Sequence, residues 1–222
     1  MKRLGCALGL CSLSVGLVCL MLSGRPAHAE MYVAGQAGVN IPYNLSNVEW
    51  SAGGITLGGN DLSLHNSLMY GAKFGYYFDP LKWLGVETEV FNATPHVKQQ
   101  NLTIGGFDLG TAPGLNLRIL TWAPVNIVVR HQMGAFEPYA GVGLGVFFSR
   151  FSDGTDSSSS TDVGLNTQLG LRYRVTTNLA LFGEWKFNHA NLSHSNFLGA
   201  NGVDVSADYN AHNLVFGVGY HF

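Results

Sequence analysis

Apolar residues recur at every second position in eight separate stretches of this chain, with small or polar residues between them. Two residues is the side-chain period of a β-strand, so each stretch predicts a strand with one apolar and one polar face. No apolar run after Leu22 approaches the roughly 18 residues of a membrane-spanning helix. The eight predicted strands are Met31–Ile41, Leu68–Phe78, Leu84–Asn92, Leu115–Arg130, Tyr139–Phe148, Val163–Arg174, Leu179–Asn188 and Asn213–Phe222.

The connections between these stretches alternate between long and short. A barrel whose antiparallel strands cross a membrane has short turns at one end and longer loops at the other. The sequence therefore predicts an all-β fold, an eight-stranded antiparallel up-and-down transmembrane β-barrel. The short connections are Asp79–Trp83, His131–Pro138 and Thr176–Asn178, and the long ones are Pro42–Ser67, Ala93–Gly114, Ser149–Asp162 and His189–Asp208.

Pro124 interrupts the fourth stretch, because proline cannot donate a hydrogen bond to a neighbouring strand. A β-bulge at this position, or a strand end that rises beyond the membrane, would accommodate it. Simple alternation along the stretch places Leu117 and Ile119 on the apolar face. The same alternation places Asn116 and Arg118 on the polar face.

Glycines accumulate on the polar faces and indicate which face is inside. Gly141, Gly143 and Gly145 alternate with bulky residues, and so do Gly71 and Gly75. Glycine weakens a solvent-facing strand, whereas the narrow interior of an eight-stranded barrel needs small residues beside large ones. We therefore expect the apolar faces to contact lipid and the polar faces to line the lumen.

Charged residues of both signs share the polar faces. A single charge in a narrow lumen costs several kcal/mol unless it is paired. We therefore expect an ion-paired network that plugs the lumen; a gated ion path lined by the same charges is the alternative. The predicted network contains Lys73, Glu87, Glu89, Arg118, Arg172, Arg174, Glu184 and Lys186.

The first 29 residues have the pattern of a secretory signal peptide. A basic start at Met1–Arg3 precedes an apolar run from Leu4 to Leu22, and the triplet Ala27–Ala29 ends the segment. We expect cleavage before Glu30, which divides the chain into a signal peptide, residues 1–29, and a barrel domain, residues 30–222. An uncleaved membrane anchor is the alternative, since the apolar run is about as long as a spanning helix.

Composition narrows the class of protein further. Charged residues make up 12% of the chain, against roughly 25% in typical globular proteins. All three cysteines lie in the predicted signal peptide, so the barrel domain contains no thiol. The signal peptide also takes three of the 12 basic residues, which leaves nine against 14 acidic residues and a net charge of −5. Such a chain offers no basic face for nucleic acid.

Three motifs resemble those of a known family. The alternating run Leu214, Phe216, Val218, Tyr220 and Phe222 resembles the carboxy-terminal signal that outer-membrane proteins present to the barrel assembly machinery. Phe136–Gly145 and Leu84–Glu89 resemble the fifth and third strands of small OmpA-like and opacity-type β-barrels. The resemblance covers the chain from Glu30 onward. It implies an outer-membrane location, assembly by that machinery, and roles in surface structure or adhesion.

Candidate chemistry on the predicted loops is weak. His65, His96, His189, His194 and His212 could meet at one rim, yet no pair has the close spacing of metal ligands. The acidic segment Ser152–Asp162 lacks the ordered carboxylates of a calcium loop.

Lipid A deacylases resemble this barrel in size and use a His, a Ser and a Glu. In those enzymes one residue separates the His and the Ser, so both lie on the same face of a strand, within hydrogen-bond reach. Here His194 and Ser195 are adjacent and would point to opposite faces, and Glu184 is expected in the lumen. The sequence thus predicts no catalytic, cofactor or metal site and no enzyme.

The leading hypothesis is an integral outer-membrane barrel with a structural, surface-display or adhesion role. Its expected partners are membrane lipid and lipopolysaccharide, the assembly machinery and an extracellular ligand of the loops. The alternatives are a small OmpW-like channel for small or apolar solutes and a lipid A-modifying enzyme. The outer loops carry more acidic than basic residues, namely Glu49, Asp61, Asp108, Asp153, Asp156, Asp162, Asp204 and Asp208 against Lys98 and Arg150.

Overall fold

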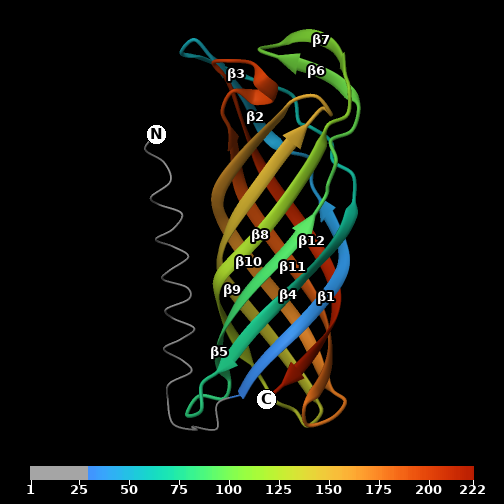
Figure 1. Ribbon diagram of the computed structural model, residues 1–222, viewed down its shortest axis with the longest axis vertical. Coiled ribbons are helices and arrows are strands. Elements are labelled where there is room, and N and C mark those ends of the chain that lie inside the picture. Colours follow the sequence, from blue (N-terminus) through green and yellow to red (C-terminus); the bar gives the residue numbers. More distant parts are fainter. Residues whose placement is uncertain (1–29) are drawn as a thin grey trace.

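A computed structural model describes residues 30–222, so the predicted signal peptide lies outside the described residues. Eight strands form a closed antiparallel barrel, in which the last strand pairs with the first. They follow one another around the wall in sequence order and are tilted against the barrel axis (Figure 1). The predicted eight-stranded fold is thereby confirmed. The wall consists of β1 (Glu30–Pro42), β4 (Ser67–Tyr77), β5 (Leu84–Ala93), β8 (Asn116–Arg130), β9 (Phe136–Ser152), β10 (Ser157–Arg174), β11 (Leu179–His194) and β12 (Val203–His221).

Two additional hairpins stand at one end of the barrel (Figure 1). The first, β2 (Ser46–Ala52) and β3 (Ile55–Gly58), continues the wall because β2 pairs with the upper part of β12. The second, β6 (Gln100–Ile104) and β7 (Phe107–Ala112), is a separate two-stranded sheet. We call this the hairpin end and the opposite one the turn end. Within residues 30–222, no helix is long and apolar enough to cross a membrane.

Two of the predicted long connections are mostly strand, and the prediction was wrong for them. β9 and β10 reach Ser152 and Ser157, so only a short turn joins them. β11 and β12 extend to His194 and Val203, and the connection contains a 3-10 turn, η1 (Phe197–Gly199). The reason is that the outward residues of these strands become polar toward this end, so the apolar alternation no longer marks the strand.

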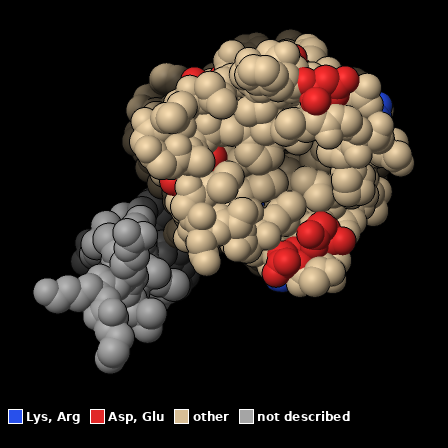
Figure 2. All heavy atoms as spheres, turned by 90° about the horizontal axis from the view of Figure 1, so that it is seen from above, with Lys and Arg blue, Asp and Glu red and all other residues tan. Residues whose placement is uncertain are grey.

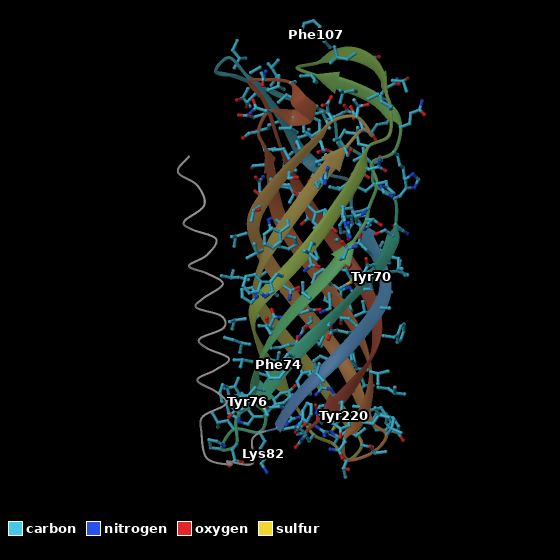
Figure 3. All side chains as sticks on the ribbon, in the orientation of Figure 1. Tyr70, Phe74, Tyr76, Lys82, Phe107 and Tyr220 are labelled. Carbon is cyan, nitrogen blue, oxygen red and sulfur yellow. The ribbon has the colours of Figure 1, made fainter. Side chains whose placement is uncertain are left out.

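The apolar faces point outward and the glycine-bearing faces point inward, as predicted. Leu144 and Phe216 are 62% and 73% exposed. Tyr70, Phe74, Tyr76 and Tyr220 project from the outer wall (Figure 3).

The inward glycines make room for large neighbours. A Cβ atom on Gly75 would lie 2.2 Å from the Tyr32 ring. One on Gly170 would lie 2.4 Å from the Tyr139 ring, so neither position accepts a larger residue without rearrangement.

Pro124 lies in a β-bulge, one of the two arrangements predicted for it. The registers of β8 with β5 and with β9 both shift at this point. One extra residue reverses the faces of all residues beyond it. Leu117 and Ile119 are consequently buried inside the barrel, whereas Arg118 is exposed on the outside. The predicted faces of this part of β8 were therefore wrong.

Toward the hairpin end the strands exchange their polar and apolar faces. On β11 the outward residues change from Trp185 to the polar Asn191 and Ser193. The inward residues change from the charged Lys186 to the apolar Leu192. Polar residues on the outside and apolar residues within are the pattern of a water-soluble protein. The outer surface of the barrel is thus polar near the hairpin end, as in a protein surrounded by water, and apolar below it.

Candidate functional site

The interior of the barrel is the candidate functional site, and five charged side chains form its central layer. The two carboxylate oxygens of Glu184 lie 2.5 Å from Lys186 Nζ and 2.8 Å from Lys73 Nζ. Lys73 also pairs with Glu87 at 3.3 Å. Lys186 also pairs with Glu89 at 2.6 Å. No side chain of this lysine layer is more than 1% exposed.

Three arginines and two glutamates form a second layer, nearer to the turn end. Glu137 pairs with Arg130 at 3.2 Å, with Arg174 at 3.1 Å and also with Arg172. Glu30 pairs with Arg130 at 2.7 Å and also with Arg174. These five residues are called the arginine layer.

Two tyrosines join the layers. The Tyr32 hydroxyl donates to Glu87, and its ring centroid lies 4.6 Å from Arg172 Cζ. The Tyr139 hydroxyl donates to Glu184 at 2.6 Å, and its ring centroid lies 5.0 Å from the same atom. The lysine layer has one more anion than cations and the arginine layer one more cation than anions. Joined in this way, the two layers balance each other's charge.

Seven of the eight charged residues predicted to line the lumen belong to these layers. Arg118 does not, because the bulge turns it outward, where its Nε donates to Asn92 Oδ1 at 2.9 Å. Their partners Glu30, Arg130 and Glu137 were not among the predicted residues. Glu30 and Glu137 each lie two residues before an inward tyrosine, Tyr32 and Tyr139, so the alternation of the strands already places both glutamates inside the barrel. The seven are Lys73, Glu87, Glu89, Glu184 and Lys186 in the lysine layer, and Arg172 and Arg174 in the arginine layer.

A chain of asparagine side chains crosses the interior above the lysine layer. Each Nδ2 donates to the Oδ1 of the next residue over 2.7–3.0 Å. None of the five residues is more than 1% exposed. Hydrogen-bonded amides of this kind hold neighbouring strands in one arrangement without any buried charge. The chain runs from Asn40 through Asn213, Asn188 and Asn166 to Asn126.

An apolar core closes the barrel at the hairpin end. Its members come from the wall strands, from β2 and from the connecting loops. Leu117, Phe147 and Leu192 are at most 1% exposed. We call this cluster the apolar cap. Its buried members are Leu45, Val48, Leu62, Leu64, Val97, Leu117, Ile119, Phe147, Phe151, Ala190, Leu192, Phe197, Val205, Ala207, Tyr209 and Ala211.

His194 lies beside the apolar cap, inside the barrel. Its Nε2 lies 2.9 Å from Ser149 Oγ and its Nδ1 lies 2.8 Å from Ser158 Oγ. Burial lowers the pKa of His194 to about 4, so its ring is neutral near pH 7. The predicted partners of an enzyme are not gathered around it: Ser195 lies in the exposed bend after β11, and Glu184 belongs to the lysine layer. His194 bonds on both nitrogens to serine hydroxyls, with no carboxylate on either.

The five histidines proposed for the rim do not gather at one place, although the His65 N–H donates to the carbonyl of His96 at 2.9 Å. His194 faces the interior, whereas His212 packs on Trp185 outside, with ring centroids 5.3 Å apart. His189 Nδ1 lies 2.8 Å from Asn210 Oδ1. Among residues 30–222, no three histidine, aspartate or glutamate side chains gather in a group that could hold a metal ion.

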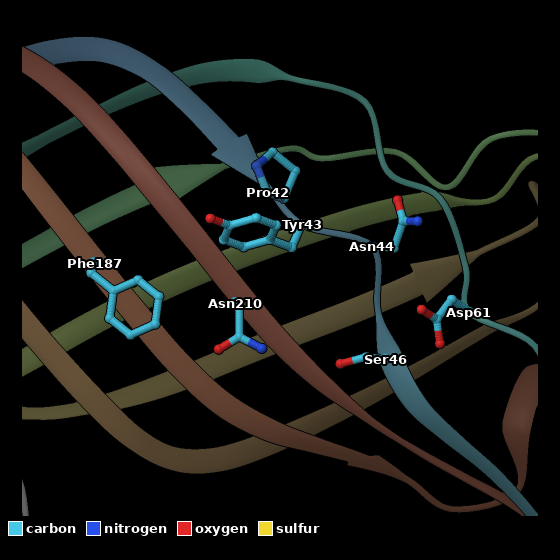
Figure 4. A pocket seen from close by; sticks show the side chains of 7 residues that line it. All are labelled: Pro42, Tyr43, Asn44, Ser46, Asp61, Phe187 and Asn210. Carbon is cyan, nitrogen blue, oxygen red and sulfur yellow. The ribbon is translucent and has the colours of Figure 1, made fainter.

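An open hollow of about 610 Å³ lies on the outer wall where β1 ends (Figure 4). It combines the rings of Tyr43 and Phe187 with polar groups of Asp61 and Asn210. The Tyr43 hydroxyl also lies 3.0 Å from His212 Nε2. The hollow is lined in addition by Pro42, Asn44 and Ser46.

Acidic side chains gather at separate places on the hairpin end, while Lys and Arg show only at its margin (Figure 2). Some of the acids are held by neutral partners. The Asp208 carboxylate accepts from Asn47 at 2.7 Å and from Asn191 at 3.0 Å. These hydrogen bonds lower the pKa of Asp208.

The residues of the predicted assembly signal lie on or directly after β12. Leu214, Phe216, Val218 and Tyr220 are between 48% and 73% exposed on the outer wall. Phe222 follows the strand, and its N–H donates to the carbonyl of Met31 at 2.9 Å, which closes the turn end.

The model of one protein family, described as the outer membrane protein beta-barrel domain, matches residues 15–222. OprG, an outer membrane protein from Pseudomonas aeruginosa, is 19% identical with a TM-score of 0.60, over 87% of this chain and 96% of that chain. Neisserial surface protein A (NspA) is 15% identical with a TM-score of 0.55, over 86% of this chain and 97% of that one. A major outer membrane protein from Thermus thermophilus is 16% identical with a TM-score of 0.52, over 87% of this chain and 99% of that one. These similarities concern the fold. Among curated proteins, none matches the sequence.

Proposed function

The chain belongs to the outer membrane protein beta-barrel family, and from that premise we propose that it is an integral outer-membrane protein with a structural or surface-display role. The observation that carries this proposal is the filled interior. The arginine layer, the lysine layer, the asparagine chain and the apolar cap follow one another along the barrel. The lysine layer, the asparagine chain and the apolar cap consist of buried side chains, and the arginine layer is partly buried, with Glu30 and Arg174 about one-fifth exposed. A solute would have to displace all four to pass.

The hairpin end supports a display role that includes adhesion. Ile55, Phe107 and Leu109 are 61–75% exposed at the hairpins, beyond the apolar cap. Exposed aromatic and aliphatic residues on hairpins are suited to contact another surface. The expected partners are therefore an extracellular ligand of these loops, surrounding membrane lipid including lipopolysaccharide and, through the carboxy-terminal strand, the assembly machinery.

Planar-bilayer recording tests the closed interior. We expect the purified protein to insert without reproducible unitary currents. The Glu87→Gln and Arg172→Gln variants each remove one charge from the interior and serve as reporters. Unitary currents in the wild type that change in size in these variants would contradict a closed barrel and favour a small channel for small or apolar solutes.

A lipid A-modifying enzyme is the second alternative, and it has a separate test. Mass spectrometry compares lipid A from cells with and without the protein. An unchanged acyl pattern is expected, because Glu184 is engaged by two lysines and Ser195 lies outside the buried His194 cluster. A change in acyl chains that the His194→Gln variant abolishes would overturn the structural role.

A further inference from the structure

Arg118 and Arg150 face each other on the outer wall. They are direct cross-strand partners on β8 and β9, and both are exposed. The residues beside them along the strands, such as Leu117 and Ser149, are buried inside the barrel. Directly opposite side chains in an antiparallel pair have Cβ atoms about 4.5–5.5 Å apart. Arg118 turns toward β5 and Arg150 toward β10 in this structure, and a rotation of both side chains toward each other brings the two guanidinium groups within reach of the same small ligand.

Nothing within the described chain neutralises this pair. Neither arginine forms an ion pair with a carboxylate of residues 30–222. Arg118 donates to the neutral Asn92, and Arg150 Nη2 donates to Ser157 Oγ at 3.0 Å. Like charges directly opposite each other destabilise a sheet. Direct opposition of these two positive charges is therefore unfavourable, and an anion between them would relieve the repulsion.

The nearest acidic residue along the chain is turned elsewhere. The Asp153 carboxylate accepts from the backbone N–H groups of Thr155 at 2.8 Å and Asp156 at 2.7 Å. The carboxylate is thus bound by the backbone of its own turn and forms no ion pair with either arginine.

The pair lies at the border between the apolar band and the polar upper wall. The next outward positions toward the turn end are Leu120 and Phe148, which are also direct partners and are 40% and 39% exposed. The next positions toward the hairpin end are Asn116 and Ser152. A side chain at this border lies where lipid headgroups begin.

We propose that Arg118 and Arg150 together bind the phosphate group of a lipid in the outer leaflet. A phosphate monoester offers several acceptor oxygens and a charge of up to −2, and guanidinium groups bind it through paired hydrogen bonds. The adjacent apolar row favours a phosphate that is attached to acyl chains over a free anion. The inference rests on the proposed membrane location but on none of the roles proposed for the loops.

Native mass spectrometry in dodecyl maltoside, a detergent without phosphate, tests the site. The probes are lipid A with its phosphates and the same lipid A after their removal. We expect the wild type to prefer the phosphorylated lipid, and each of Arg118→Gln and Arg150→Gln to weaken that binding by about tenfold. The matched control is Lys82→Gln with Lys98→Gln, which removes two exposed charges outside β8 and β9 and should bind as the wild type does. Lys82 lies at the turn end (Figure 3).

Thermal unfolding separates binding from a purely structural role. Without phosphorylated lipid, the double variant Arg118→Gln/Arg150→Gln should be at least as stable as the wild type, because a repulsion is removed. With phosphorylated lipid A, only the wild type and the lysine control should gain stability. Equal binding of both lipids by the wild type, or unchanged binding by the double variant, would overturn the proposal. Complete displacement of the lipid by millimolar inorganic phosphate would instead assign the site to a free anion. Normal insertion of all variants shows that the membrane location itself is intact.

Discussion

Glu184 holds the lysine layer together, because it contacts both lysines and also accepts from Tyr139. Replacing it with alanine leaves two buried ammonium groups that share the remaining glutamates. Removing one partner of a buried ion pair typically costs about 3–5 kcal/mol. We expect a loss of that size in the free energy of unfolding of Glu184→Ala, measured by urea titration in lipid vesicles. Thr161→Ala, an exposed change on β10, is the control, and an equal effect of both variants would contradict the assigned role.

His194 makes the stability of the hairpin end depend on pH. The folded protein has a pKa of about 4 for this group, while the unfolded chain has the ordinary value of 6.5. Between these values the unfolded chain binds the proton more readily, so stability is full above pH 6.5 and falls as the pH drops toward 4. The loss attributable to this group is up to about 3 kcal/mol.

Urea titrations between pH 7.5 and pH 4 measure this effect. The His194→Gln variant keeps a hydrogen-bonding side chain but cannot titrate, so its stability should fall less steeply than that of the wild type over this range. Subtracting the free energy of unfolding of the variant from that of the wild type at each pH removes the contribution of all other titrating groups. Parallel pH profiles would show that His194 is not buried as the structure has it.

At the scale of elements, the bulge at Pro124 determines which side chains β8 presents to each side. We expect Arg118→Cys to react rapidly with a membrane-impermeant maleimide on intact cells, and Leu117→Cys to be protected. Residues 30–222 contain no cysteine of their own, so no background labelling arises from them. The opposite labelling pattern would mean that β8 continues without a bulge.

The same strand shows what the sequence could predict and what it could not. Alternation correctly gave the faces of Val125, Ile127 and Val129 on one side of Pro124. Beyond Pro124 the bulge reverses the faces, and the surroundings also change, so that apolar residues belong inside. The bulge moves the apolar positions from the outer to the inner face, and the surroundings there also favour apolar residues inside. The spacing of apolar residues in the sequence therefore stays the same, and Leu117 and Ile119 continue the alternation. A pattern of period two carries no information about which of its faces is inside.

The change from lipid to water outside the barrel also explains why the ends of β11 and β12 were not predicted. From Val205 to Ala211 the inward residues of β12 are apolar and the outward ones polar, the reverse of the pattern between Leu214 and Tyr220. A search for apolar outward faces therefore ends the strand too early. The charged network was easier to predict, since buried charges need partners and those partners must share the inward faces.

For the whole molecule, the exchange of faces divides the barrel into two parts with different solvents. The lower part has lipid outside and ions or amides inside. The upper part has water outside and the apolar cap inside. Both parts are continuous along the same strands, and the β2–β3 hairpin continues this wall through its pairing with β12. The wall therefore gives that hairpin a defined position above the bilayer, while β6 and β7 form a separate sheet beside it.

A series of outward lysine substitutions would locate the border between these two parts. Leu144 lies within the apolar wall, so Leu144→Lys should lower the free energy of unfolding in lipid vesicles by about 2–4 kcal/mol. Ser193 points outward above the border, and Ser193→Lys should change it by less than about 1 kcal/mol. Leu192, next to Ser193 but inside the apolar cap, provides the matched contrast, because a lysine there buries a charge without a partner. Equal costs for Leu144→Lys and Ser193→Lys would mean that lipid covers the upper wall as well. In that case the polar outer face of β11 would have to be explained by a protein partner instead of water.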